Sequence, residues 1–150
     1  MTNRSTEHWF TNRETRLLYW REWRKALKDL NSEQTIAEVA IWWKFVPMIN
    51  HQIDVWNDSQ WPTAWELVGT GEFCANAQGL GIFYTLVLLG IDCNLYLVQV
   101  KDQPIVKLMV VANGTKLLNY STGEAVNFNA HEMEILKTWS PSDLTRQVKV

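Results

Sequence analysis

The longest apolar segment of the chain covers residues 73–91 and carries no charged side chain. Gly71 lies just before it and Gly90 lies near its end, and glycine is common where helices begin and end. The pattern predicts a buried helix of about 16 residues, about 25 Å long. A membrane span is the alternative interpretation, but Asn76 and Gln78 make the first half of the segment too polar for it.

Two amphipathic helices are predicted before this segment, because apolar residues recur there at intervals of three or four. The first helix ends near Leu30, and its apolar face consists of Leu17, Trp20, Trp23, Leu27 and Leu30. The second begins at Asn31 or Ser32 and ends at Pro47. Its apolar stripe consists of Ile36, Val39, Ala40, Trp43 and Val46. Trp42 lies outside this stripe, so the second helix carries apolar groups on more than one side.

After Gly90 the apolar period changes from helical to alternating, which is typical of strands. Strands are predicted at residues 94–100, 105–112, 116–120 and 124–128. Asn113 and Gly114 form a strong hairpin signal between the second and third of these strands. Residues 132–139 fit either a last strand or a short helix. Helices followed by an antiparallel sheet predict an α+β fold, with the long apolar helix packed on one face of the sheet.

The length of 150 residues predicts a single domain with a substantial hydrophobic core. Four parts are expected in chain order: an N-terminal arm at residues 1–11, a Trp-rich helical part at residues 12–70, the long helix with the antiparallel sheet at residues 71–139, and a C-terminal tail at residues 140–150. The arm is polar except for Trp9 and Phe10. We therefore expect these two side chains to be buried, either on the domain itself or on another molecule.

The charge balance and the cysteine content exclude several classes of partner. A net charge of −2 gives no reason to expect nucleic acid or a membrane surface as a partner. Two cysteines make no disulfide framework, and no cluster of His, Cys and carboxylate residues has metal spacing, so we expect no metal and no cofactor. Residues 1–30 are polar and charged and do not resemble a signal peptide. We therefore expect the protein to fold in a reducing cytoplasm.

The chain contains nine tryptophans, eight of them before Cys74. They predict a bulky aromatic core, although Trp and Arg are also the residues that protein interfaces favour. The polar face of the first helix is basic. It is either a solvated face with local ion pairs or a contact surface for phosphate or an acidic partner. The interface candidates are Trp9, Phe10, Arg13, Arg16, Arg21, Arg24 and Trp42.

Cys74 is the candidate for chemistry, because it falls in the first turn of the predicted long helix. Backbone N–H groups and the positive end of the helix dipole favour the nucleophilic thiolate at such a position. A cysteine hydrolase or acyltransferase also needs a base within hydrogen-bond reach of the sulfur, and a third group that orients the base.

The sequence around Cys74 resembles a known family. The Gly-x-x-Cys sequence at residues 71–74, the small residue Ala77 one turn later, and Gly90-Ile91 at the close of the helix are similar to the core helix of the transglutaminase-like members of the papain-like superfamily. The segment Trp61-Pro62-Thr63-Ala64-Trp65-Glu66-Leu67 resembles the corresponding segment of small tailed-phage proteins with this fold. Together the similarities cover residues 61–120.

The resemblance implies a catalytic histidine on one of the antiparallel strands after the helix and an aspartate on the next strand that orients it. The matching positions in this chain are Val106 or Lys107 for the histidine and Asn119 for the aspartate. Neither position has kept the residue that the family uses. An asparagine can orient a histidine, but no histidine lies between Cys74 and Ala130.

Three residues offer a replacement for the missing base. His131 requires the C-terminal segment to fold back toward Cys74, and His51 lies in the loop before the long helix. Lys107 requires burial to lower its pKa by several units. Without such a base, Cys74 is a small buried apolar residue.

Three functions follow from this sequence. The first is a non-catalytic transglutaminase-like domain that serves as a structural or adaptor component of a tailed-phage particle. Its partners are then other virion or assembly proteins or copies of itself, and its location is the host cytoplasm during synthesis and the virion afterwards. The second is an active cysteine hydrolase or acyltransferase that uses Cys74 on an amide of peptidoglycan or protein, with His131, His51 or Asn119 as its partners. The third is a host-directed binding protein that needs only its Trp and Arg surfaces.

Overall fold

The computed structural model of the chain describes residues 7–47, 53–71, 73–100, 102, 104–119, 124–129, 131 and 133–148. Helices make up the first half of the chain and antiparallel strands most of the second half. The chain therefore has the α+β fold that the change of apolar period predicted. His51 lies outside the described residues.

Helices and short turns of 3-10 helix precede the sheet. They are η1 (Glu7–Phe10), α1 (Arg13–Ala26), η2 (Leu27–Asp29), α2 (Ser32–Lys44), η3 (Asp58–Gln60), α3 (Ala64–Thr70) and α4 (Ala75–Leu88). Polar side chains cap three of them. Asn12 caps α1 by accepting a hydrogen bond of 2.8 Å from the Thr15 N–H, and capping boxes at Asn31 and Thr63 begin α2 and α3. Each such cap contributes about 1 kcal/mol to stability.

The helix α4 is the predicted long helix, with 14 residues. Gly90 adopts a φ of +77° just after it, the left-handed conformation that commonly ends a helix. Leu80, Phe83 and Leu86 of α4 are all fully buried. Among the described residues, no helix has the length and hydropathy that a membrane crossing requires.

One antiparallel sheet follows α4. Its strands are β1 (Cys93–Val100), β2 (Val106–Ala112), β3 (Lys116–Leu118), β4 (Val126–Asn127) and β5 (Met133–Trp139), in the spatial order β4-β3-β2-β1-β5. Leu95 of β1 pairs with Val110 of β2 on one side and with Trp139 of β5 on the other. The predicted strands are confirmed, with shorter bounds for β3 and β4, and the segment left open as strand or helix is a strand.

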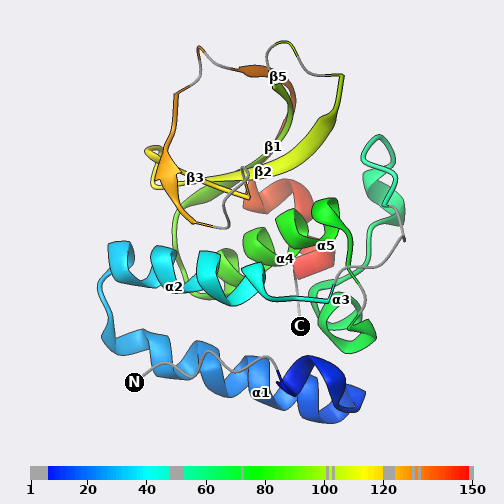
Figure 1. The fold of residues 1–150 in the computed structure, drawn as a ribbon, viewed down its shortest axis with the longest axis vertical. Helices are drawn as coiled ribbons and strands as arrows, with labels where there is room; N and C mark the ends of the chain where they lie inside the picture. Colours follow the sequence, from blue (N-terminus) through cyan, green and yellow to red (C-terminus); the bar gives the residue numbers. More distant parts are fainter. Residues whose placement is uncertain are drawn as a thin grey trace.

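The elements form successive layers, which Figure 1 shows as the sheet, then α4 with α2, then α1. The helix α4 packs on β1 and β2, α2 packs on α4, and α1 packs on α3. Leu95, Leu108 and Val110 belong to the main core on the helical face of the sheet. The opposite face carries a second, smaller cluster formed by Val98, Met109, Val111, Leu117 and Met133.

Tryptophans fill much of the core between the helices, as predicted. Seven of the nine are buried. Trp23 and Trp42 stack with their ring centroids 4.3 Å apart. Trp20 and Trp43 both donate a hydrogen bond to the Thr85 hydroxyl of α4, at 3.3 Å and 3.0 Å. These bonds fix α1 and α2 against the same point of α4.

The prediction of a C-terminal tail is wrong for residues 141–148. They form η5 (Pro141–Leu144) and α5 (Thr145–Val148), and α5 contacts α4. Leu144 and Val148 are buried, because their spacing of four residues places both on the same side of this turn of helix. The Gln147 side chain donates a hydrogen bond of 3.1 Å to the Asp58 carbonyl. The segment is therefore part of the domain.

Candidate functional site

Cys74 is the N-cap of α4 and not, as predicted, a residue of its first turn. Its backbone is extended, with φ −118° and ψ 177°. Its Sγ accepts a hydrogen bond of 3.4 Å from the Ala77 N–H, which is one of the donors that a helix start leaves free. The side chain is only 3% exposed. The sulfur thus occupies the position that a serine or asparagine oxygen takes at other helix starts.

Two asparagines join this end of α4 to the sheet. Asn76 Oδ1 accepts a hydrogen bond of 3.0 Å from the Leu108 N–H. Asn119 Nδ2 donates to the Ala75 carbonyl at 2.9 Å and to the Leu108 carbonyl at 2.8 Å. Asn119 therefore lies beside the start of α4, where the resemblance expects the aspartate. Its amide is used to hold two backbone segments together.

The two β2 positions that match the family histidine face opposite sides of the sheet. Successive strand residues alternate between faces, so Val106 shares a face with Leu108, which packs in the core on the α4 side. Lys107 shares the other face with Met109, in the smaller cluster. Burial lowers the pKa of Lys107, but its position on the face away from α4 excludes it as a base for Cys74.

The remaining histidine candidate also stays apart from the thiol. His131 is exposed in the connection between β4 and β5, where its N–H donates to Asn129 Oδ1 at 3.1 Å. Within the described part of the chain, the Ala77 N–H is the one group that forms a hydrogen bond with Cys74 Sγ. The structure therefore brings Asn119 to the start of α4 and leaves His131 elsewhere.

Thiol chemistry requires a proton acceptor beside the sulfur, and no described side chain of that kind forms a hydrogen bond with Cys74 Sγ. The Asn119 amide nitrogen is a donor that already serves two carbonyls, and Val106 on the facing strand is apolar. The second cysteine, Cys93, is also poorly suited to act as a nucleophile, because its thiolate form is disfavoured. Burial, with the nearby charge of Asp92, raises the pKa of Cys93 to about 12. No group of three potential metal ligands occurs among the described residues.

Two of the interface candidates, Trp9 and Trp42, are buried in the core of this chain, and their assignment to an intermolecular surface is wrong. The Trp9 ring lies 4.7 Å from that of Trp42 and 5.0 Å from that of Phe73. The physical reason is that η1 packs on α1 and brings the Trp9 ring against the tryptophans of α2. Phe10 is 76% exposed and stays an interface prediction.

Arg13 and Arg16 join α1 to the end of α3. The Arg16 guanidinium donates to the carbonyl oxygens of Thr11, Val68 and Gly69. The Arg13 side chain lies against Gly69, where an added Cβ would come within 2.8 Å of its Nη1. Arg16 is thus occupied inside the domain, and Arg13 packs on α3 at the same place.

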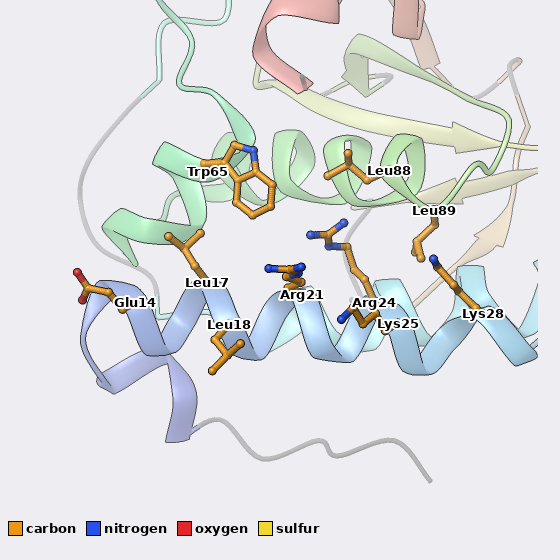
Figure 2. Close-up of a pocket in the computed structure, with 10 residues that line it drawn as sticks. All are labelled: Glu14, Leu17, Leu18, Arg21, Arg24, Lys25, Lys28, Trp65, Leu88 and Leu89. Carbon is orange, nitrogen blue, oxygen red and sulfur yellow. The ribbon is translucent and has the colours of Figure 1, made fainter. Parts of the chain in front are cut away.

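Arg21 and Arg24 instead line an open groove between α1, α3 and the end of α4 (Figure 2). The Arg24 guanidinium lies 4.2 Å from the ring centroid of Trp20 and 5.5 Å from that of Trp65. Burial, followed by the charge of Arg21, lowers the pKa of Arg24, although an arginine stays protonated in proteins. The sequence pattern missed Trp65 as part of this surface, because it lies on another helix far along the chain.

Neither the comparison with protein-family models nor the search of curated proteins found a match for this sequence.

Proposed function

We propose that this chain is a non-catalytic domain of the transglutaminase-like type that acts through protein–protein contacts, as a structural or adaptor component of a tailed-phage particle. The observation that carries the proposal is the buried Cys74 sulfur, which caps α4 and faces no base among the described residues. A group that serves as a helix cap stabilises the fold whether or not it reacts.

Three further features support the transglutaminase-like part of the proposal. A cysteine begins a buried helix, the helix packs on an antiparallel sheet, and Asn119, the residue after β3, contacts the start of that helix. The order of these parts agrees with the family pattern that the sequence resembles. The residues at the histidine and aspartate positions differ from those of the family, because Val106 or Lys107 and Asn119 stand there. This difference favours a domain with a structural and not a catalytic role.

The adaptor part rests on the surface of α1 and on the resemblance of the Trp61–Leu67 segment to small tailed-phage proteins. Arg21 and Arg24 line an open groove, and neither forms an ion pair with a carboxylate among the described residues. A protein that binds through such a surface does not need a reactive thiol.

The first test measures the accessibility of Cys74. In a Cys93→Ala variant only Cys74 remains to be alkylated, and we expect iodoacetamide to label the native protein at least about 100-fold more slowly than the urea-unfolded protein. A Cys74→Ala variant reports Cys93 as the control. Rapid native labelling of Cys74, together with amide hydrolysis that Cys74→Ala abolishes, contradicts the proposal and assigns a cysteine hydrolase.

The second test asks where the protein is found. Quantitative mass spectrometry of purified particles, made from the genome that encodes this chain, should give a fixed ratio of the chain to the main coat protein. A chain that is absent from the particles and recovered on a host-cell component contradicts the adaptor function, and assigns the host-directed binding function instead.

A further inference from the structure

A groove of about 680 Å³ runs along α1, and we call it the basic groove. Its basic side chains are Arg21, Arg24, Lys25 and Lys28. Trp65 of α3 and Leu88 at the end of α4 form its apolar wall (Figure 2). One carboxylate also lines it, that of Glu14, and Figure 2 places Glu14 at the opposite end from Lys28.

The four basic residues share one face of α1 and the turn that follows, because their spacing of three and four residues matches the helical repeat. A row of like charges on one face is unfavourable unless negative charge balances it. Lys25 lies 3.6 Å from Glu22, in an exposed pair. Arg21, Arg24 and Lys28 form no ion pair with any carboxylate in the described part of the chain.

Two side chains that line the groove also carry a buried donor without an acceptor. Nε of Arg24 and Nε1 of Trp65 are buried, and neither has a hydrogen-bond partner among the described residues. Burying a donor without an acceptor costs free energy. The Arg24 guanidinium is held in place by the Trp20 and Trp65 rings, with its charge uncompensated. The groove thus combines a surplus of donors and positive charge with an apolar wall, in a chain whose net charge is −2.

We propose that the basic groove binds an acidic amphipathic helix of a partner protein, with its apolar side chains on the Trp65 and Leu88 wall and its carboxylates on Arg21, Arg24 and Lys28. This proposal rests on the proposed function, since it names the partner class for a domain that works by protein contacts. The groove extends from Glu14 to Lys28, which corresponds to about 21 Å, or about four turns of a bound helix.

The shape of the groove favours a helix over a membrane. A membrane surface is broad and meets a protruding face, whereas these basic side chains share a hollow with an apolar wall contributed by two other helices. Carboxylates match guanidinium groups in a bidentate geometry. Groove-binding helices place apolar anchors at intervals of three or four residues. Leu18, 57% exposed at the groove, is available as a further apolar contact.

The test is a selection from a displayed library of 18-residue amphipathic peptides, with each polar position drawn from Glu, Gln and Lys and each apolar position from Leu, Ile, Met and Phe. The full-length protein is the target. We expect at least fivefold enrichment of Glu over Lys at the polar positions. Selected peptides should bind an Arg21→Gln/Lys28→Gln variant at least about tenfold more weakly by fluorescence anisotropy.

A Lys44→Gln/Lys116→Gln variant is the matched control, because it removes the same charge from positions that do not line the groove. Its affinity for the selected peptides should equal that of the unmodified protein, and a Leu18→Gln variant should lose about threefold. Selection without preference for Glu, or equal binding by the Arg21→Gln/Lys28→Gln variant, overturns the proposal. Binding to phosphatidylserine vesicles that depends on Arg21 and Lys28, without Glu enrichment, assigns the groove to a membrane and also overturns it.

These outcomes are independent of the tests of the proposed function. The groove variants leave Cys74 and its surroundings untouched, so thiol accessibility and the copy number in particles still report on the non-catalytic adaptor. If Cys74 is alkylated slowly and the chain is present in particles at a fixed ratio to the coat protein, but no acidic helix binds, only the groove proposal is refuted. An active thiol refutes the proposed function alone.

Discussion

The two ends of α4 meet opposite conditions. At its start, Cys74, Asn76 and Asn119 use their polar atoms on backbone groups of α4 and β2. At its other end, Leu88 faces a groove where basic side chains outnumber carboxylates and where two buried donors lack partners among the described residues. Among the described residues, the polar groups at the start of α4 have hydrogen-bond partners within the chain. Arg21, Arg24 and Lys28 in the groove have no carboxylate partner there.

This difference separates stability from recognition. A satisfied buried network stabilises one arrangement, and removal of any member leaves another polar group without a partner. A groove with surplus positive charge contributes little to folding, and a ligand can supply the carboxylates that Arg21, Arg24 and Lys28 lack among the described residues. Substitutions at the start of α4 should therefore affect the free energy of unfolding, whereas substitutions in the basic groove should affect binding.

The largest effect is expected for Asn119→Asp, which introduces the aspartate that the transglutaminase-like resemblance implies at this position. A carboxylate at this place faces the Ala75 and Leu108 carbonyls in a site only 9% exposed. We expect a loss of about 3–5 kcal/mol of unfolding free energy at pH 7, measured by urea denaturation. Asn119→Ala removes the two hydrogen bonds and also places alanine at a φ of +67°, which alanine tolerates less well than asparagine, so it should lose about 2–3 kcal/mol.

The same variant should also depend on pH. Burial beside two carbonyl oxygens raises the pKa of the introduced carboxyl group above its value in the unfolded chain. The folded protein then binds the proton more readily, so the variant should be most stable at acidic pH and lose stability as the pH rises. Asn119→Ala should not show this additional slope. An Asn119→Asp protein that is as stable as the unmodified protein at pH 7 would mean that water reaches the start of α4.

The next largest effect is expected for Gly79→Ala, at the point where α4 packs closely against β2. An added Cβ would lie 2.6 Å from the Leu108 carbonyl oxygen and 3.0 Å from Asn119 Nδ2. Alanine would gain about 1 kcal/mol of helix propensity at an unrestricted site. Because backbone of β2 is the obstacle, we expect instead a net loss of about 2 kcal/mol in urea denaturation. A stabilised variant would mean that α4 can move away from the sheet at little cost.

The contrast between the two ends also explains which features the sequence predicted. The apolar run ending at Gly90 and the Asn113-Gly114 turn are local signals, so α4 and the first strands were predicted with small shifts in their bounds. The resemblance matched Asn119 to the family aspartate, but its hydrogen bonds to the Ala75 and Leu108 carbonyls were not predicted. The burial of Cys74 and Asn119 depends on hydrogen bonds between residues that are distant in the sequence, so the sequence alone did not predict it.

Other features were missed because their signals were weak or nonlocal. Trp9 lies in a polar segment, and only the turn of η1 brings it to Trp42 and Phe73. Leu144 and Val148 form a single apolar pair in a polar segment, too short a pattern to predict a docked turn. The basic face of α1 was recognised, but its apolar wall comes from α3 and α4, which the sequence cannot align with α1.

A smaller effect is expected for Cys74→Ala, which removes the cap but leaves no buried charge. We expect a loss of about 1 kcal/mol in urea denaturation, the usual contribution of a helix cap. Cys74→Ser should keep most of the stability, since its hydroxyl can accept the same Ala77 N–H. Both variants should bind the selected acidic peptides as tightly as the unmodified protein. Loss of peptide binding in both would show that the two ends of α4 are coupled.

The smallest effect on stability is expected for the Arg21→Gln/Lys28→Gln variant. Both side chains are exposed and form no ion pair in the described part of the chain, so the unfolding free energy should change by less than about 0.5 kcal/mol. The change should be slightly favourable, because Arg21 and Arg24 carry like charges close together. Urea denaturation at 20 mM and 500 mM NaCl checks this reason, since salt should remove the gain. A loss above 1 kcal/mol would mean that these cations already stabilise the folded chain, and the groove would then resemble the sealed end of α4.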